Sequence, residues 1–221
     1  MPVFDKWAWI KRNWAYVLEE ATGLGLVFVG GTALNLVLFK EYRASEDIDL
    51  YDPQAKTIGA AHEKECVEKL AKRLAKKGFE IKSRDERALW IGPNIKVEVF
   101  NDGTLFTRID KKNIGQTDVL TFDLQTYAEM KMAALLCRSN YDARDLVDLF
   151  VMKKQAGFVP QFPKRECDVI ENGFDERMRD IKRTNKEDLR IFQTDKQIED
   201  LHYGEFEEFK KWLYDWLSGF R

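Results

Sequence analysis

The chain has 221 residues, of which 44% are hydrophobic and 33% charged, with a formal net charge of −2. This balance excludes a strongly basic nucleic-acid coat. It also argues against a disordered chain, because six Trp, seven Tyr and fifteen Phe need a core. Three scattered Cys and two His exclude a disulfide scaffold and a zinc finger. No stretch approaches the ~20 apolar residues of a membrane span, and the charged first residues argue against a signal peptide. We therefore expect a soluble, cytoplasmic protein that does not bind membranes.

The first half of the chain predicts strands interleaved with helices. Apolar residues at helical spacing predict helices over 5–21, 32–42 and 58–77. Short apolar or alternating runs predict strands over 26–29, 45–51, 79–83, 88–91 and 95–100. A glycine pair stops the first of these strands, and a Gly-Pro-Asn turn separates the last two.

The second half predicts helices alone, over 124–138, 142–156, 163–182 and 196–219. Residues 1–115 carry 19 basic and 17 acidic groups, for a charge of +2. Residues 116–221 carry 17 and 21, for −4. This shift in composition predicts an α/β domain over 1–115 and a helical domain over 116–221.

Two carboxylates stand two residues apart in the predicted strand 45–51. Side chains at that spacing project from one face, so Asp47 and Asp49 lie side by side. Adjacent carboxylates repel, and a divalent cation such as Mg²⁺ or Mn²⁺ relieves the repulsion while binding substrate phosphates. Glu98 would complete a triad if its strand paired beside this one, and Asp102 is the alternative third carboxylate. An isolated Asp-x-Asp is usually a solvated pair, so its meaning depends on what accompanies it.

A glycine pair precedes these carboxylates in the chain. Gly30 and Gly31 let the backbone approach a ligand closely, and the helix that follows offers free N–H groups, with Thr32 as its candidate cap. A glycine pair alone is usually a turn. In combination with the acids, this strand–turn–helix unit indicates a site for a nucleoside triphosphate bridged by metal ions.

The segment GGTALNLVLFKEYRASEDIDLY (30–51) resembles the first motif of the DNA polymerase β-like nucleotidyltransferase superfamily. Its form GGTAL…R-x-SEDIDL is similar to the AbiEii/AbiGii group, which includes toxins of bacterial toxin–antitoxin and abortive-infection systems. The third carboxylate of this superfamily is usually Asp, whereas Glu98 is the candidate here. The resemblance implies metal binding by Asp47 and Asp49, triphosphate binding by Gly30 and Gly31, and places beside the phosphates for Arg43 and Ser45.

A second segment, YAEMKMAALLCRSNYDARDLVDLF (127–150), resembles the E-x-x-x-K…R…RD-x-x-D segment of the same family. Lys131 and Arg138 share a helix face about 10 Å apart, where they could hold a triphosphate tail or a nucleic-acid phosphate. Arg144 and Asp148 are spaced for a helical ion pair. The resemblance implies catalysis by Lys131 and Asp148, the latter as a base or as a group that orients the lysine. The alternative is a structural salt bridge between two helices.

Two further features have competing interpretations. A basic stretch over 72–87 holds seven positive residues against three acids, and fits a nucleic-acid surface or the solvated face of a helix. Trp212, Tyr214 and Trp216 fit core packing better than base stacking. Neither His belongs to a motif, and no Cys-His pair can be assembled from the sequence.

Together these features predict a metal-dependent nucleotidyltransferase. It would move a nucleoside monophosphate from a nucleoside triphosphate, ATP among the candidates, to an acceptor hydroxyl and release pyrophosphate. The resemblance implies an α+β fold, with a polymerase β-like mixed sheet, flanking helices and a C-terminal helical domain, and an active site in the cleft between the domains. It further suggests tRNA, another RNA or a protein side chain as acceptor, and an antitoxin as partner. The alternative is a non-catalytic nucleotide- or RNA-binding module of the same fold.

Overall fold

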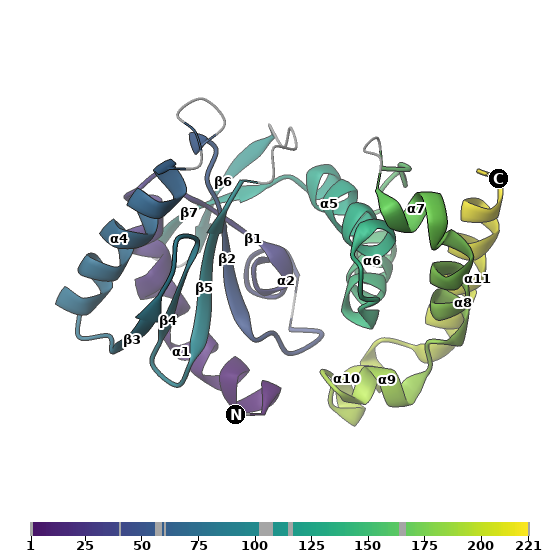
Figure 1. The fold of residues 1–221 in the computed structure, drawn as a ribbon. Coiled ribbons are helices and arrows are strands. Elements are labelled where there is room, and N and C mark those ends of the chain that lie inside the picture. Colours follow the sequence, from purple (N-terminus) through teal and green to yellow (C-terminus); the bar gives the residue numbers. More distant parts are fainter. Residues whose placement is uncertain are drawn as a thin grey trace. The chain divides into compact units, whose positions relative to one another are not determined.

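A computed structural model describes residues 2–39, 41–55, 59, 61–101, 108–114, 117–163 and 167–220, without the side chains of Asp168 and Val169 (Figure 1). The chain divides into two compact units, which we call the N-terminal unit (Met1–Asp123) and the C-terminal unit (Leu124–Arg221). The N-terminal unit holds a mixed seven-stranded sheet with helices packed on it. The described residues of the C-terminal unit form helices and no strand. The predicted α+β class is therefore confirmed.

The sheet has the strand order β3-β4-β5-β2-β1-β7-β6, in which β2 pairs with β5 and β1 with β7 in parallel, and the other neighbours are antiparallel. The strands are β1 (Val27–Val29), β2 (Asp47–Tyr51), β3 (Ile81–Arg84), β4 (Ala88–Ile91), β5 (Ile95–Phe100), β6 (Ile109–Ile114) and β7 (Thr117–Phe122). The helical elements of this unit are α1 (Val3–Thr22), α2 (Gly30–Ala33), the π-helical η1 (Leu34–Leu38) and α4 (Ala61–Lys76).

One face of the sheet is sealed by α1 and α4, which lie on the same side of it (Figure 1). Burial alternates along the central strands: Ile48 and Leu50 of β2 are buried, whereas Asp47 and Asp49 are partly exposed. Removing the apolar surface of Ile48 and Leu50 from water stabilises the fold by about 25 cal/mol per Å². A slip of one residue would expose both side chains, so their burial holds β2 in one register. The two aspartates consequently project from the opposite face.

The helix predicted over 32–42 begins earlier and ends earlier than expected. It starts at Gly30 and widens into the π-helical turn of η1, where the amide of Phe39 donates to the carbonyl of Leu34. The buried Asn35 side chain donates to the Gly31 carbonyl and accepts from the amides of Tyr42 and Arg43. The Asn35 side chain therefore satisfies backbone amides that a continued helix would otherwise have bonded. The helix ends here, and the chain turns back toward β2.

The strands β6 and β7 were absent from the sequence prediction. Only Ile109 and Ile114 of β6 are apolar, and most of its residues are exposed, so it has no apolar alternation. In β7, the buried Thr121 donates its hydroxyl to the carbonyl of Phe28, 93 residues earlier. The boundary predicted near residue 115 falls between these two paired strands.

The C-terminal unit contains α5 (Leu124–Cys137), α6 (Ala143–Gln155), α7 (Asp168–Asn172), α8 (Phe174–Arg183), α9 (Lys186–Arg190), α10 (Asp195–Asp200) and α11 (Tyr203–Ser218). The two long helices predicted over 163–182 and 196–219 are each divided, the first at Gly173 and the second at His202, whose φ is +57°. Residues 164–166 of the former lie outside the described residues. Capping boxes at Asn185 and Thr194 start the short helices α9 and α10.

Aromatic packing holds the C-terminal unit together. Phe150 of α6 packs against Phe206 and Phe209 of α11, with ring centroids 5.5 Å apart in each pair. The buried Arg177 of α8 donates to carbonyls of Leu135 and Arg138 at the end of α5, which satisfies groups that a helix leaves unpaired. Trp212, Tyr214 and Trp216 are half-buried rather than enclosed. Among the described helices, none is long and apolar enough to cross a membrane.

Candidate active site

The parallel pairing of β2 with β5 brings together the acids that the sequence singled out. Asp49 is in register with Glu98, and Asp47 with Lys96. Residues in register on neighbouring strands point to the same face, so Glu98 joins the two aspartates on the partly exposed face. The strand pairing on which the candidacy of Glu98 depended is thus present. Asp102, the alternative third carboxylate, lies outside the described residues.

A lysine accompanies these carboxylates, and the sequence analysis had given it no role. Lys96 donates to Glu98, with Nζ 2.6 Å from Oε2. Partial burial of Lys96 disfavours its charged form and by itself would lower its pKa. The hydrogen bond to Glu98 and the negative fields of Glu98, Asp49 and Asp47 nevertheless outweigh that effect and raise the pKa of Lys96. Lys96 is thus a counter-ion for the whole cluster, which we call the carboxylate cluster (Asp47, Asp49 and Glu98).

The glycine pair lies directly against charged side chains of its own motif. Gly30 has a φ of +77°, and a Cβ there would overlap the Asp49 carboxylate. A Cβ on Gly31 would overlap the guanidinium of Arg43. Position 30 therefore favours glycine for both its φ and the packing of Asp49, and glycine at position 31 makes room for the guanidinium of Arg43.

The other residues of the first motif are buried and connect its parts. Thr32 donates its hydroxyl to the carbonyl of Asp47. It does not cap the helix as predicted, because the helix begins two residues earlier and Thr32 lies within its first turn. Arg43 donates to the carbonyl of Ala44 at 2.9 Å, and Ser45 is 2% exposed. The motif thus holds β1, α2 and β2 in one arrangement.

The second motif forms a buried charge cluster in the C-terminal unit. Lys131 of α5 places Nζ 2.8 Å from Asp145 Oδ1 and 2.7 Å from Asp148 Oδ2, both on α6. All three side chains are nearly inaccessible to water. Arg138, whose side chain is 54% exposed, places Nη1 3.1 Å from the other oxygen of Asp145. We call this group the lysine cluster (Lys131, Arg138, Asp145 and Asp148).

Asp145 is the member of this cluster that the sequence analysis overlooked. Its spacing of three from Asp148 puts both acids on one face of α6, and this pattern could have identified it. Arg144 binds Asp142, with Nη2 2.8 Å from Oδ2, and Asp142 also caps α6. Lys131 and Arg138 both reach Asp145, so the carboxylate bridges the two cations on which the prediction had focused.

Residues 17–213 of the chain match the family described as nucleotidyl transferase AbiEii toxin, type IV toxin–antitoxin system. The chain belongs to this family. Among curated proteins, none matches it.

Two solved structures are similar to this AbiEii-family chain. JHP933 from Helicobacter pylori aligns with a TM-score of 0.51 at 16% identity, covering 95% of this chain and 92% of its own. An antigenic nucleotidyltransferase-like protein from Paracoccidioides brasiliensis aligns with a TM-score of 0.49 at 18% identity, covering 77% and 88%. At this identity, the likeness to JHP933 concerns the fold.

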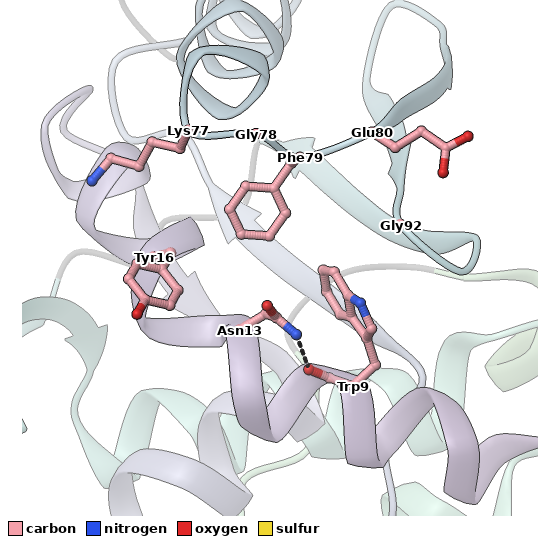
Figure 2. A pocket seen from close by; sticks show the side chains of 8 residues that line it. All are labelled: Trp9, Asn13, Tyr16, Lys77, Gly78, Phe79, Glu80 and Gly92. Carbon is pink, nitrogen blue, oxygen red and sulfur yellow. Dashed lines mark hydrogen bonds between the residues drawn. The ribbon is translucent and has the colours of Figure 1, made fainter.

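The N-terminal unit of this AbiEii-family chain also has a pocket of about 620 Å³ that none of the predicted site residues lines (Figure 2). Trp9 of α1 and Phe79 face each other across it, edge to face at 5.9 Å. Trp9 also packs against Gly92 in the turn between β4 and β5. Since α1 lies on the sheet face opposite Asp47 and Asp49, the pocket is separate from the carboxylate cluster.

Replacing Gly30 by Ala tests the packing against Asp49. The matched control is Gly78→Ala: Gly78 has a φ of +89°, and among the described residues no heavy atom lies within 4 Å of a Cβ there. Both variants incur the strain of positive φ, about 1–2 kcal/mol. We expect Gly30→Ala to lose more free energy of unfolding in urea than Gly78→Ala, because only Gly30→Ala displaces a carboxylate. Equal losses would contradict the close approach.

Replacing Lys131 by Met tests the lysine cluster. The change leaves Asp145 and Asp148 buried without their ammonium partner, which should lower the free energy of unfolding by about 3–5 kcal/mol. The control is Lys196→Met, because Lys196 pairs with Asp200 in an exposed i,i+4 contact that contributes at most about 1 kcal/mol. Unfolding in urea is followed by tryptophan fluorescence, to which Trp212 and Trp216 of this unit contribute, and by circular dichroism of the helices. Similar losses in the two variants would show that Lys131 is not needed for folding.

Proposed function

We propose that the chain transfers a nucleoside monophosphate from a nucleoside triphosphate to an acceptor hydroxyl and releases pyrophosphate. The observation that carries this proposal is the carboxylate cluster, with Asp49 packed against Gly30, in a chain of a nucleotidyl transferase family. A strand that presents paired acids beside a glycine turn offers a charged, partly exposed surface where triphosphate and acceptor can meet.

The carboxylate cluster would bind a hard divalent cation chiefly through its two aspartates. Asp47 and Asp49 are partly exposed, share one face of β2 and offer oxygen donors, as Mg²⁺ and Mn²⁺ prefer. Glu98 would be the third donor, and its hydrogen bond to Lys96 makes the two aspartates the primary ligands. Once bound, the ion would neutralise charge that develops on the phosphates during transfer.

The protein's own groups would bind and orient the triphosphate. Backbone amides of Gly30 and Gly31 would donate to phosphate oxygens, since neither residue carries a side chain of its own. Arg43 and Ser45 hold the end of the loop that precedes β2. Of the two basic residues in the second motif, Arg138 is half-exposed and better placed to receive a phosphate than the buried Lys131.

We assign distinct roles to the remaining acids. Asp148 is fully buried and holds Lys131 at 2.7 Å, so its role is to orient that lysine rather than to accept a proton from substrate. Glu98 is partly exposed and lies in register with Asp49, and in addition to its place as third ligand it would accept the proton of the acceptor hydroxyl. An RNA such as tRNA is the proposed acceptor, with a protein side chain as the other class.

Transfer is tested with α-³²P-labelled nucleoside triphosphates, total RNA and total protein, in Mg²⁺ or Mn²⁺. We expect labelled RNA with the native chain, and a loss of more than about 100-fold in Asp47→Asn/Asp49→Asn, because that variant lacks the primary ligands. Glu46→Gln is the matched control: Glu46 belongs to the same SEDIDL segment but is not among the predicted ligands, and it pairs with Lys6 near the surface. It should retain transfer.

Each outcome of this experiment has one meaning. Labelled protein in place of RNA would identify side-chain nucleotidylation. Full transfer by Asp47→Asn/Asp49→Asn would contradict the assignment of the metal ligands. Nucleotide binding without any label would favour a non-catalytic binding module.

A toxin role makes a separate prediction in cells. Induced expression of the native chain in bacteria should arrest growth, and an antitoxin from the same system should relieve the arrest. Asp47→Asn/Asp49→Asn should permit normal growth at equal protein level, while Glu46→Gln should arrest it. Growth arrest by both variants would separate toxicity from transfer, and normal growth with the native chain would contradict the toxin role.

A further inference from the structure

Three side chains with different donor atoms meet where β2 ends and α4 begins. Asp52 directly follows β2, and His62 and Cys66 are four residues apart on one face of α4. His62 Nδ1 lies 2.6 Å from Asp52 Oδ2, and Cys66 Sγ lies 3.6 Å from the same nitrogen. The sequence analysis gave neither His a partner, because this contact depends on how α4 packs on the sheet.

The arrangement does not fit a nucleophilic cysteine. In a Cys-His-Asp triad, the thiol and the carboxylate use different nitrogens of the ring, whereas here both face Nδ1. Burial, together with the charge of Asp52, raises the pKa of the Cys66 thiol to about 11. A reactive cysteine needs the opposite shift.

The same three atoms fit a tetrahedral metal ion. They all lie within 4.8 Å of one another. Zinc binds sulfur at about 2.3 Å and nitrogen at about 2.0–2.1 Å, so its sulfur and nitrogen ligands stand roughly 3.5 Å apart. This matches the 3.6 Å between Cys66 and His62. Oxygen and nitrogen ligands of a tetrahedral zinc ion stand roughly 3.3 Å apart, so Asp52 and His62 would separate by about 0.7 Å as the ion replaces the proton between them.

Surrounding bonds hold these donors in place. The second carboxylate oxygen of Asp52 accepts from the amides of Gln54 and Ala55, which leaves Oδ2 directed at His62. Asn101 donates its side-chain amide to the carbonyl of Asp52 at 2.6 Å. Such outer contacts orient the ligands of metal sites. The His62 side chain is 12% exposed, which gives water access to a fourth position.

We propose that Asp52, His62 and Cys66 form a binding site for Zn²⁺. A mixed set of oxygen, nitrogen and sulfur donors favours zinc over the Mg²⁺ or Mn²⁺ expected at the carboxylate cluster. The two sites are separate. Side chains alternate between the faces of a strand, so Asp52 points to the same face as the buried Ile48 and Leu50, which is the face covered by α4. Zinc would join the end of β2 to the first turns of α4.

The test uses Co²⁺ as a spectroscopic probe in Cys137→Ser/Cys167→Ser, in which Cys66 is the remaining thiol. We expect one thiolate-bound Co²⁺ per chain, with a thiolate-to-cobalt absorption band and the visible bands of a tetrahedral ion, all removed by an equivalent of Zn²⁺. Excess Mg²⁺ should leave the bands unchanged. Asp47→Asn/Asp49→Asn in the same background should bind Co²⁺ through Cys66 as before, which separates this site from the carboxylate cluster.

Variants of the ligands and a matched histidine decide the assignment. Cys66→Ala should abolish the thiolate band, and His62→Gln should weaken Co²⁺ binding at least tenfold, while His202→Gln should leave it unchanged. Zinc should also raise the Tm of the native chain by several degrees and not that of His62→Gln. Circular dichroism without metal checks that each variant is folded. Absence of a thiolate band in the folded parent, or equal affinity in folded His62→Gln, would overturn the proposal.

Discussion

The close approach of the Asp49 carboxylate to the Cα of Gly30 is the constraint on which the N-terminal unit depends. It fixes the distance between the turn after β1 and the middle of β2, and only a residue without a Cβ permits it. The register of β2 against β5 then sets Glu98 beside Asp49. A backbone conformation and a strand register together assemble an acidic surface from residues that stand far apart in the chain.

Repulsion between neighbouring carboxylates is reduced in different ways in the two clusters. The carboxylate cluster is partly exposed, so water and Lys96 moderate the repulsion between its acids. The lysine cluster is buried, and Lys131 has to compensate two carboxylates on α6. The first arrangement leaves acidic oxygens accessible to a cation. The second fixes the angle between α5 and α6 and leaves Arg138 as its accessible member.

Local patterns predicted the strands that carry the candidate site. The alternation of Asp47 to Leu50 gave the correct face for both aspartates, and the strand over 95–100 was found at its observed bounds. Strand β6 was not predicted, because its residues do not alternate between apolar and polar. Strand β7 pairs with β1 as well as with β6. Because β1 lies far away in the sequence, no local pattern indicated this pairing. The meeting of Asp52 with His62 and Cys66 could not be predicted either, because it depends on how α4 packs against the sheet.

The parallel pairing of β1 with β7 also affects the order in which the protein can form. The bond from Thr121 to Phe28 spans 93 residues, so the sheet is completed only after almost all of the N-terminal unit has left the ribosome. Long-range strand pairing of this kind slows folding, because the loop must close before the contact is gained. A nascent chain therefore lacks the finished sheet until synthesis reaches the C-terminal unit.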